Sequence, residues 1–120
     1  MNEARAFVDG WSKVWNGCDS NAGLYMDLLH EGCPLINPIN PIKREDLPGF
    51  TTPVLEMEPD IRVVPVRWAA TDDGVLIEWV NRGTVRGARF ELYGADRYTL
   101  RDGKAAEGYS YFDPRPFLGE

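Results

Sequence analysis

The chain has 120 residues, of which 43% are hydrophobic and 12% aromatic, and these proportions favour a single globular domain over residues 1–120. Its net charge of -6 argues against nucleic acid or an anionic membrane surface as main partner, and its apolar runs are too short to cross a membrane. The opening MNEARAFVDGW carries early acids and no apolar core of signal-peptide length, so we expect a cytoplasmic protein.

The first quarter of the chain is predicted to form two helices. Residues 3–16 carry apolar side chains at the i, i+4, i+7 and i+8 spacing that lines one face of a helix. Residues 20–31 are predicted to form the second helix, which Ser20 or Asn21 would cap and Gly32 would end. The expected inward side chains are Phe7, Trp11, Val14 and Trp15 in the first helix and Leu24, Tyr25 and Leu28 in the second.

The middle of the chain is rich in proline and is predicted to be mostly irregular. Residues 33–37 are expected to be extended, and the following NPINPIK is expected to be a shaped loop because its prolines lack amide donors. A short helix is expected over 43–50, broken by Pro48 and Gly49. A loop is expected over 51–60.

The second half of the chain is predicted to form four strands that pair in sequence. The pairs Asp73-Gly74, Arg86-Gly87 and Asp102-Gly103 mark the reversals between them. Helices followed by an antiparallel meander indicate an α+β fold, in which the helices cover one face of a curved sheet and leave a cavity beneath it. The predicted strands are 61–70, 75–84, 89–101 and 104–113.

Asp96 is an acid on the apolar face of the third strand. Successive strand residues point to opposite sides, so Asp96 shares its side with Phe90, Leu92 and Tyr98. A buried carboxylate without a partner is costly, so Asp96 must be paired, protonated or at work in a pocket. Two interpretations stay open: a proton-transfer group, or a structural acid held by a Trp, Tyr or Arg side chain.

The cysteines and the histidine give no metal-binding pattern. Cys18 and Cys33 fit no metal-ligand spacing, and we expect two reduced thiols, with a disulfide between them as the alternative. His30 is expected at a helix end rather than as a ligand. Too few nitrogen and sulfur ligands are present for a zinc site, so we expect no metal.

Three motifs occur in order over nearly the whole chain. They are the aromatic helix FVDGWSKVWNGCD, the strand IEWVNRGT, and the tail GADRYTLRDGK followed by YFDP. In this order they resemble the SnoaL-like polyketide cyclase family. That family belongs to the nuclear-transport-factor-2-like superfamily, which includes ketosteroid isomerases and limonene-epoxide hydrolases. The resemblance implies a cone-shaped, curved antiparallel sheet around a pocket, packed on N-terminal helices and often dimeric.

The resemblance also implies a chemistry. In SnoaL-like cyclases an aspartate of the third-strand motif moves protons during an aldol ring closure, without metal or cofactor, and by motif this residue is Asp96. Burial in an apolar pocket should raise its pKa and suit it to proton transfer beside a carbonyl. The additional acids of the epoxide hydrolases would fall at Trp79, Asn81 and Ser110, so hydrolysis is not expected. The water-positioning asparagine of those hydrolases would be Asn37.

The resemblance also predicts which side chains face the pocket. Trp15 and Trp79 would either pack or stack on a substrate. Asn81 and Ser110 would either orient a carbonyl group of the ligand or hydrogen-bond to each other. Small residues on the last strand, such as Ala106, would leave room for a ligand. The predicted substrate-binding residues are Trp15, Asn37, Trp79, Asn81, Phe90, Leu92, Tyr98, Ser110 and Phe112.

Two functions and one assembly follow as expectations. The first function is a cofactor-independent acid/base enzyme of the cyclase, isomerase or lyase type, which uses Asp96 on a small hydrophobic carbonyl compound. The second is a non-catalytic module that binds a small molecule or dimerises. Tyr93, Tyr109 and Tyr111 should point outward, and aromatic side chains on an outer sheet face predict a homodimer.

Overall fold

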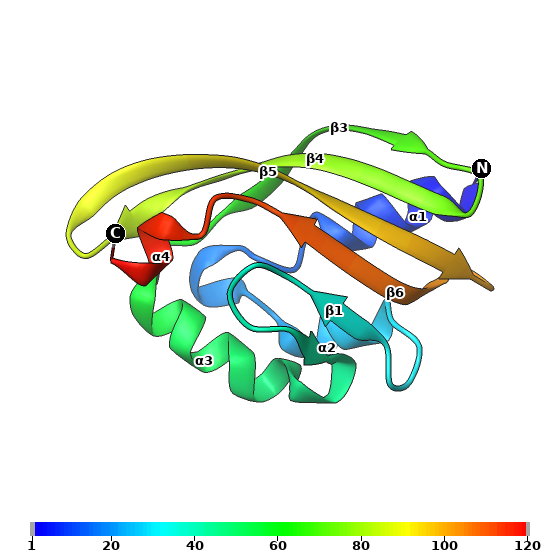
Figure 1. Cartoon of the computed structure of the whole chain (residues 1–120), viewed down its shortest axis with the longest axis horizontal. Helices are drawn as coiled ribbons and strands as arrows, with labels where there is room; N and C mark the ends of the chain where they lie inside the picture. Colours follow the sequence, from blue (N-terminus) through cyan, green and yellow to red (C-terminus); the bar gives the residue numbers. More distant parts are fainter. Residues whose placement is uncertain (1, 120) are drawn as a thin grey trace.

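The computed structural model describes residues 2–119 and places six strands in one sheet, in the order β2-β1-β6-β5-β4-β3 (Figure 1). The long strands form the predicted antiparallel meander, and β1 pairs with β6 in parallel. The strands are β1 (Pro34–Ile36), β2 (Ile42–Lys43), β3 (Val63–Ala70), β4 (Gly74–Val85), β5 (Ala88–Arg101) and β6 (Lys104–Tyr111). The α-helices are α1 (Asn2–Trp11), α2 (Ala22–Asp27), α3 (Leu47–Met57) and α4 (Arg115–Leu118).

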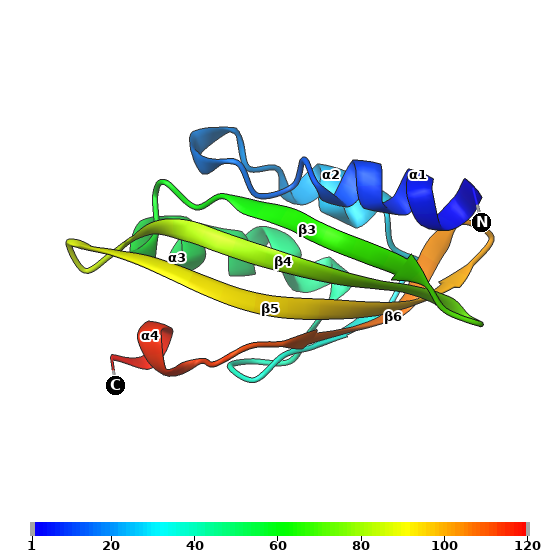
Figure 2. The same cartoon turned by 90° about the horizontal axis from the view of Figure 1, so that it is seen from above.

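The sheet is strongly curved, and the helices lie against its concave side. In Figure 1 the sheet arches over α2 and α3, and Figure 2 shows α1 lying along β3 and β4. The aromatic face of α1 is buried as predicted, and the ring of Phe7 lies 4.7 Å from that of Tyr98 on β5. The architecture is therefore the predicted α+β fold with a curved sheet. Within residues 2–119, no helix is both long and apolar enough to cross a membrane.

Glycines on the concave face make room for large rings from neighbouring strands. Gly94 lies opposite Trp79, and a Cβ added there would lie 2.5 Å from the Trp79 ring. Gly108 lies opposite Tyr98, and a Cβ there would lie 2.7 Å from the Tyr98 ring. The space beside Gly94 and Gly108 is therefore filled by these two rings, which fixes where their polar atoms point.

A register shift changes the inward face at the start of β6. The pairing of β5 with β6 is interrupted between Thr99 and Leu100, so Leu100 lies opposite Ala105. Such a bulge adds one residue to one strand and reverses the alternation beyond it. Ala105 is consequently fully buried, and the expectation that Ala106 points inward is wrong.

The first helix is shorter than predicted because tertiary pairing draws the chain away from it. The helix ends at Trp11, and Trp15 lies in the segment that follows. There the Gly17 amide donates to the carbonyl of Ile61 at 2.6 Å, and Val63 donates to the carbonyl of Trp15 at 3.3 Å. These bonds satisfy the backbone in place of helical ones. The second helix also shortens, but Asn21 caps it as predicted.

The largest correction concerns α3, which runs through the segment predicted to be a broken helix and a loop. Proline at the second helical position, Pro48, is tolerated because the first turn has no partner for its amide. Pro53 lies inside the helix on an exposed side, where water can satisfy the carbonyl it leaves unpaired. The apolar side chains that hold α3 against the fold recur at helical spacing: Leu47, Phe50, Val54 and Met57.

Candidate functional site

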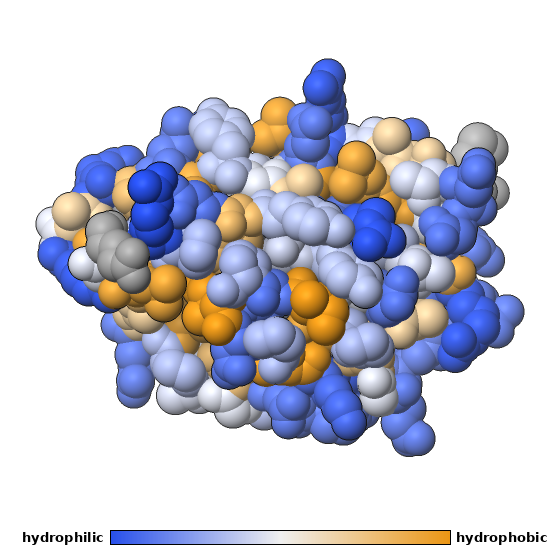
Figure 3. Space-filling view, viewed as in Figure 1, coloured by the Kyte–Doolittle hydropathy of each residue, from blue (hydrophilic) through white to orange (hydrophobic). Residues whose placement is uncertain are grey.

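A cavity of about 340 Å³ lies between the concave face of the sheet and the helices. Its wall is almost entirely apolar, with aromatic rings from α1, α2, β4 and β5 and aliphatic side chains from α3. Figure 3 shows hydrophobic side chains gathered on the surface over β1 and the following loop, where Ile36 and Ile39 are 37% and 40% exposed. A volume above about 300 Å³ is typical of small-molecule sites.

Asp96 lies on the wall of this cavity and accepts three side-chain hydrogen bonds. Its Oδ1 accepts from Trp79 Nε1 at 2.9 Å and from Ser110 Oγ at 2.6 Å, and its Oδ2 accepts from Tyr98 Oη at 2.7 Å. The register explains the convergence, since Ser110 lies directly opposite Asp96 on β6 and Trp79 lies two residues along β4 from the opposite position. Asp96 itself is 7% exposed.

Two further side chains extend this group from the helices. Trp11 of α1 donates from Nε1 to Tyr98 Oη at 2.9 Å. Tyr25 of α2 makes a 2.6 Å contact between its hydroxyl and that of Tyr98. Both residues line the cavity, and neither was among the predicted site residues. The Asp96 network therefore joins two helices to three strands.

Burial dominates the electrostatics of the network. It raises the pKa of Asp96 above the ordinary aspartate value, and the donors from Ser110, Tyr98 and Trp79 oppose this effect. Burial and the nearby Asp96 raise the pKa values of Tyr25 and Tyr98, so both phenols are neutral near pH 7. The site therefore combines a carboxyl group whose pKa is raised above the ordinary aspartate value with neutral hydroxyl groups, of which those of Tyr98 and Ser110 donate to it.

A second buried carboxyl group, Glu58, was missed by the sequence analysis. It follows the last residue of α3, is 0% exposed, and accepts from Asn81 Nδ2 at 3.0 Å through Oε1. Its Oε2 and the Asn81 Oδ1 have no hydrogen-bond partner within the described part of the chain. Burial raises the pKa of Glu58 to about 7. The one available signal was Asn81, an inward amide that needs a buried partner.

Most of the predicted substrate-binding residues lie on the cavity, but two do not. Phe90 packs edge-on against Phe117 of α4 at 5.7 Å, and Phe117 takes its place on the wall. Leu92 is buried in the core rather than in the cavity wall. The predicted residues that do line the cavity are Trp15, Asn37, Trp79, Asn81, Asp96, Tyr98, Ser110 and Phe112.

Asn37 lines the cavity, but its amide is occupied by its own loop. Its Oδ1 accepts from the backbone amides of Ile39 and Asn40 at 2.9 and 2.8 Å, and its Nδ2 donates to the Asn40 carbonyl at 2.9 Å. Such bonds are typical of asparagine in turns. In this arrangement the oxygen and the nitrogen of the Asn37 side chain hold the turn that lines the cavity.

The remaining predicted polar residues form no centre of their own. Cys18 is exposed and Cys33 is buried, and both are free thiols. The His30 ring nitrogen Nε2 contacts the carbonyl of Arg101 at 2.5 Å. Among residues 2–119, no group of three or more His, Cys, Asp or Glu side chains could hold a metal ion.

A curved sheet folded over an apolar cavity, with the buried carboxyl group of Asp96 at its wall, is the architecture of the nuclear-transport-factor-2-like fold. The family model described as "SnoaL-like domain" matches residues 4–108. The chain therefore belongs to the SnoaL-like domain family. No curated protein sequence matches this chain.

Solved structures share this fold at low sequence identity. A Catenulispora acidiphila protein of ketosteroid-isomerase-like fold, solved with trimethylamine, is 19% identical at a TM-score of 0.81, covering 94% of this chain and 89% of its own. A Jannaschia protein provisionally named a SnoaL-like polyketide cyclase is 16% identical at a TM-score of 0.76, covering 98% of this chain and 90% of its own. A Bacillus cereus protein provisionally named a polyketide cyclase is 16% identical at a TM-score of 0.80, covering 98% of this chain and 78% of its own.

Proposed function

We propose that this protein is a cofactor-independent acid/base enzyme that acts on a small hydrophobic carbonyl compound, with Asp96 as the proton-transfer residue. The observation that carries the proposal is a buried carboxyl group of raised pKa on the wall of an apolar cavity. A carboxylate whose pKa is raised is a stronger base than an ordinary carboxylate, which suits it to take a proton from carbon.

The proposed reaction starts with a carbonyl compound whose adjacent C–H bond faces Asp96. The carboxylate takes this proton and leaves an enolate, whose oxygen carries the developing negative charge. The enolate carbon can then be reprotonated elsewhere or attack a second carbonyl group, which gives isomerisation or ring closure. The apolar wall offers few competing polar groups, so electrostatic contacts to the oxygen are stronger there than in water.

Proton abstraction can be measured with 2-tetralone, an apolar ketone with one carbonyl group. In heavy water, the wild-type protein should catalyse hydrogen–deuterium exchange at carbon 1, followed by proton NMR. We expect Asp96→Asn to slow this exchange by about 100-fold or more, which is the usual contribution of a general base. Asp72→Asn is the matched control because Asp72 is an exposed turn residue remote from the cavity wall. Exchange that is unchanged in Asp96→Asn would exclude the proposed role.

The alternative is a module that binds a small molecule without chemistry. One observation favours it: both carboxylate oxygens of Asp96 already accept hydrogen bonds from the protein, as a structural acid would. The same probe separates the two functions. Binding of 2-tetralone, measured by quenching of tryptophan fluorescence, without any catalysed exchange would identify a binding module.

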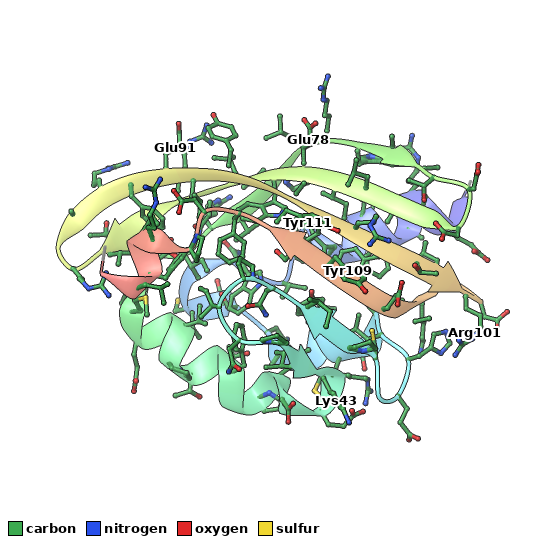
Figure 4. The ribbon with its side chains drawn as sticks, viewed as in Figure 1. Lys43, Glu78, Glu91, Arg101, Tyr109 and Tyr111 are labelled. Atoms are coloured by element: carbon green, nitrogen blue, oxygen red, sulfur yellow. The ribbon has the colours of Figure 1, made fainter. Side chains whose placement is uncertain are left out.

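We also propose a homodimer formed through the outer face of the sheet. Tyr93 and Tyr111 are 59% and 50% exposed there, and the rings of Tyr109 and Tyr111 stack at 6.4 Å. Figure 4 shows Tyr109 and Tyr111 on β6, with Glu78 and Glu91 projecting from the outer side of the sheet. Exposed aromatic side chains are enriched at interfaces. Light scattering should give twice the 13.6 kDa chain mass, and a clean monomer would contradict the proposal.

A further inference from the structure

The hydroxyl group of Tyr98 has three hydrogen-bonding partners, and only two arrangements of donors and acceptors satisfy all three. It contacts Trp11 Nε1 at 2.9 Å, Tyr25 Oη at 2.6 Å and Asp96 Oδ2 at 2.7 Å. A hydroxyl group offers one hydrogen and two acceptor positions, whereas an indole N–H only donates. Trp11 therefore always takes one acceptor position. One hydrogen and one acceptor position remain for the other two partners, so one of them must donate to Tyr98 while the other accepts.

The direction of these two bonds depends on the protonation of Asp96. When Asp96 is ionised it can only accept, so Tyr98 donates to it and Tyr25 must donate to Tyr98. The hydrogen of Tyr25 is then occupied. When Asp96 carries a proton on Oδ2 it donates to Tyr98, and the Tyr98 hydrogen turns to Tyr25. The Tyr25 hydrogen is then free, and Tyr25 lines the cavity.

We propose that Tyr25 is a second catalytic residue, which donates to the carbonyl oxygen of the ligand when Asp96 becomes protonated. The inference rests on the proposed proton transfer by Asp96 and names the group that completes it. Asp96 takes a proton from carbon, and its Oδ2 proton passes to Tyr98. The Tyr98 hydrogen then passes to Tyr25, and the Tyr25 hydrogen to the enolate oxygen. One proton moves from carbon to oxygen, and all three protein groups return to their starting state.

This coupling supplies a donor only when charge develops on the ligand. In the resting site with ionised Asp96, Trp79, Ser110 and Tyr98 direct their hydrogens to the carboxylate. A neutral ketone therefore meets oxygen acceptors and gains little. Proton abstraction by Asp96 reverses the chain and turns a hydrogen toward the new enolate oxygen. Interactions made only in the transition state accelerate the chemical step, whereas uniform binding does not.

Ser110 is the competing route. Its hydroxyl donates to Asp96 Oδ1, which also accepts from Trp79. A proton on Oδ1 would free the Ser110 hydrogen in the same way that a proton on Oδ2 frees that of Tyr25. The tyrosine route differs in that it passes through Tyr98, so removing the Tyr25 hydroxyl breaks it and leaves the Ser110 route intact.

The pH dependence of 2-tetralone binding tests the relay. Because a ketone can only accept, the wild-type affinity should fall by up to about tenfold per pH unit as pH rises through the Asp96 pKa. Tyr25→Phe removes the donor but keeps the ring, and its affinity should be independent of pH. Tyr93→Phe is the matched control, because it removes a tyrosine hydroxyl from the exposed outer face. The Asp96 pKa is measured in parallel by carbon-detected NMR.

Each outcome decides between the routes. A Tyr25→Phe variant that keeps the wild-type pH profile overturns the proposal, and loss of the profile in Ser110→Ala instead assigns the donor to Ser110. A uniform change in affinity at all pH values identifies Tyr25 as structural. A wild-type affinity that does not depend on pH refutes the relay even if the variants do not fold. Failure of the acid/base function is seen separately, as absent deuterium exchange with the pH-dependent binding retained.

Discussion

Replacing Glu58 with glutamine should stabilise the folded protein at alkaline pH and have a smaller effect at acidic pH. Burial, opposed by the hydrogen bond from Asn81, raises the pKa of Glu58 from 4.5 to about 7. The folded state thus holds this proton more tightly than the unfolded state does. The resulting stability is fully present below pH 4.5 and is lost as pH rises through 7.

The magnitude follows from the interval between the two pKa values. An interval from 4.5 to about 7 corresponds to about 3 kcal/mol, at roughly 1.4 kcal/mol per pKa unit. About 2 kcal/mol of this remains at pH 5.5, and almost none remains at pH 8. Glutamine keeps the shape of the protonated acid and does not titrate. The stability difference between Glu58→Gln and wild type should therefore increase by about 2 kcal/mol from pH 5.5 to pH 8.

Urea unfolding at the two pH values measures this difference, because contributions from all other titrating groups cancel between the variant and the wild type. Glu56→Gln is the matched control, because it replaces an exposed glutamate two residues before Glu58, at the end of α3. A stability difference that is the same at pH 5.5 and pH 8 would refute the assignment of a buried, raised-pKa carboxyl group to Glu58.

Two further substitutions and one labelling experiment test other parts of the fold. Gly94→Ala would place a Cβ 2.5 Å from the Trp79 ring, so overpacking should reduce the free energy of unfolding by about 1–3 kcal/mol, measured with urea; an unchanged value contradicts the close packing. Cys18 is exposed, whereas Cys33 is buried and its pKa is raised to about 11. A thiol reagent should therefore modify Cys18 quickly and Cys33 only on unfolding. Arg86 donates to two carbonyls of α4, so Arg86→Ala should speed amide exchange in α4 alone.

The strands could be predicted because their pattern is local. Alternation predicted the four long strands, and the pairs Asp73-Gly74, Arg86-Gly87 and Asp102-Gly103 predicted the reversals between them. In the structure, Arg86 and Asp102 have the positive φ that such tight turns use. The same reasoning failed for α3, where two prolines outweighed the helical spacing of apolar side chains. Pro48 lies in the first turn, where no helical hydrogen bond is lost. Pro53 does remove one bond, but it lies on an exposed side of the helix, where water can satisfy the carbonyl.

The site could be predicted only in part because its contacts join distant segments. Alternation placed Asp96 on the buried face, and the motif resemblance gave it a cavity. Trp11 and Tyr25 reach the network from helices 87 and 73 residues away from Tyr98 along the chain. Their donor positions follow from how the helices pack on the sheet, which spacing does not encode. Glu58 was missed because its helix was predicted to be a loop.

The positions where the resemblance places the acids of epoxide hydrolases have a different role in this chain. Trp79 and Ser110 now donate to Asp96, and Asn81 donates to Glu58. Adjacent acids would repel one another and hold at least one proton in place, whereas neutral donors stabilise the ionised form of a single carboxyl group. The exchange of acids for donors thus offsets the effect of burial on Asp96. The cavity wall thus carries one carboxyl group surrounded by neutral donors, in place of the several acids that the resemblance assigns to epoxide hydrolases.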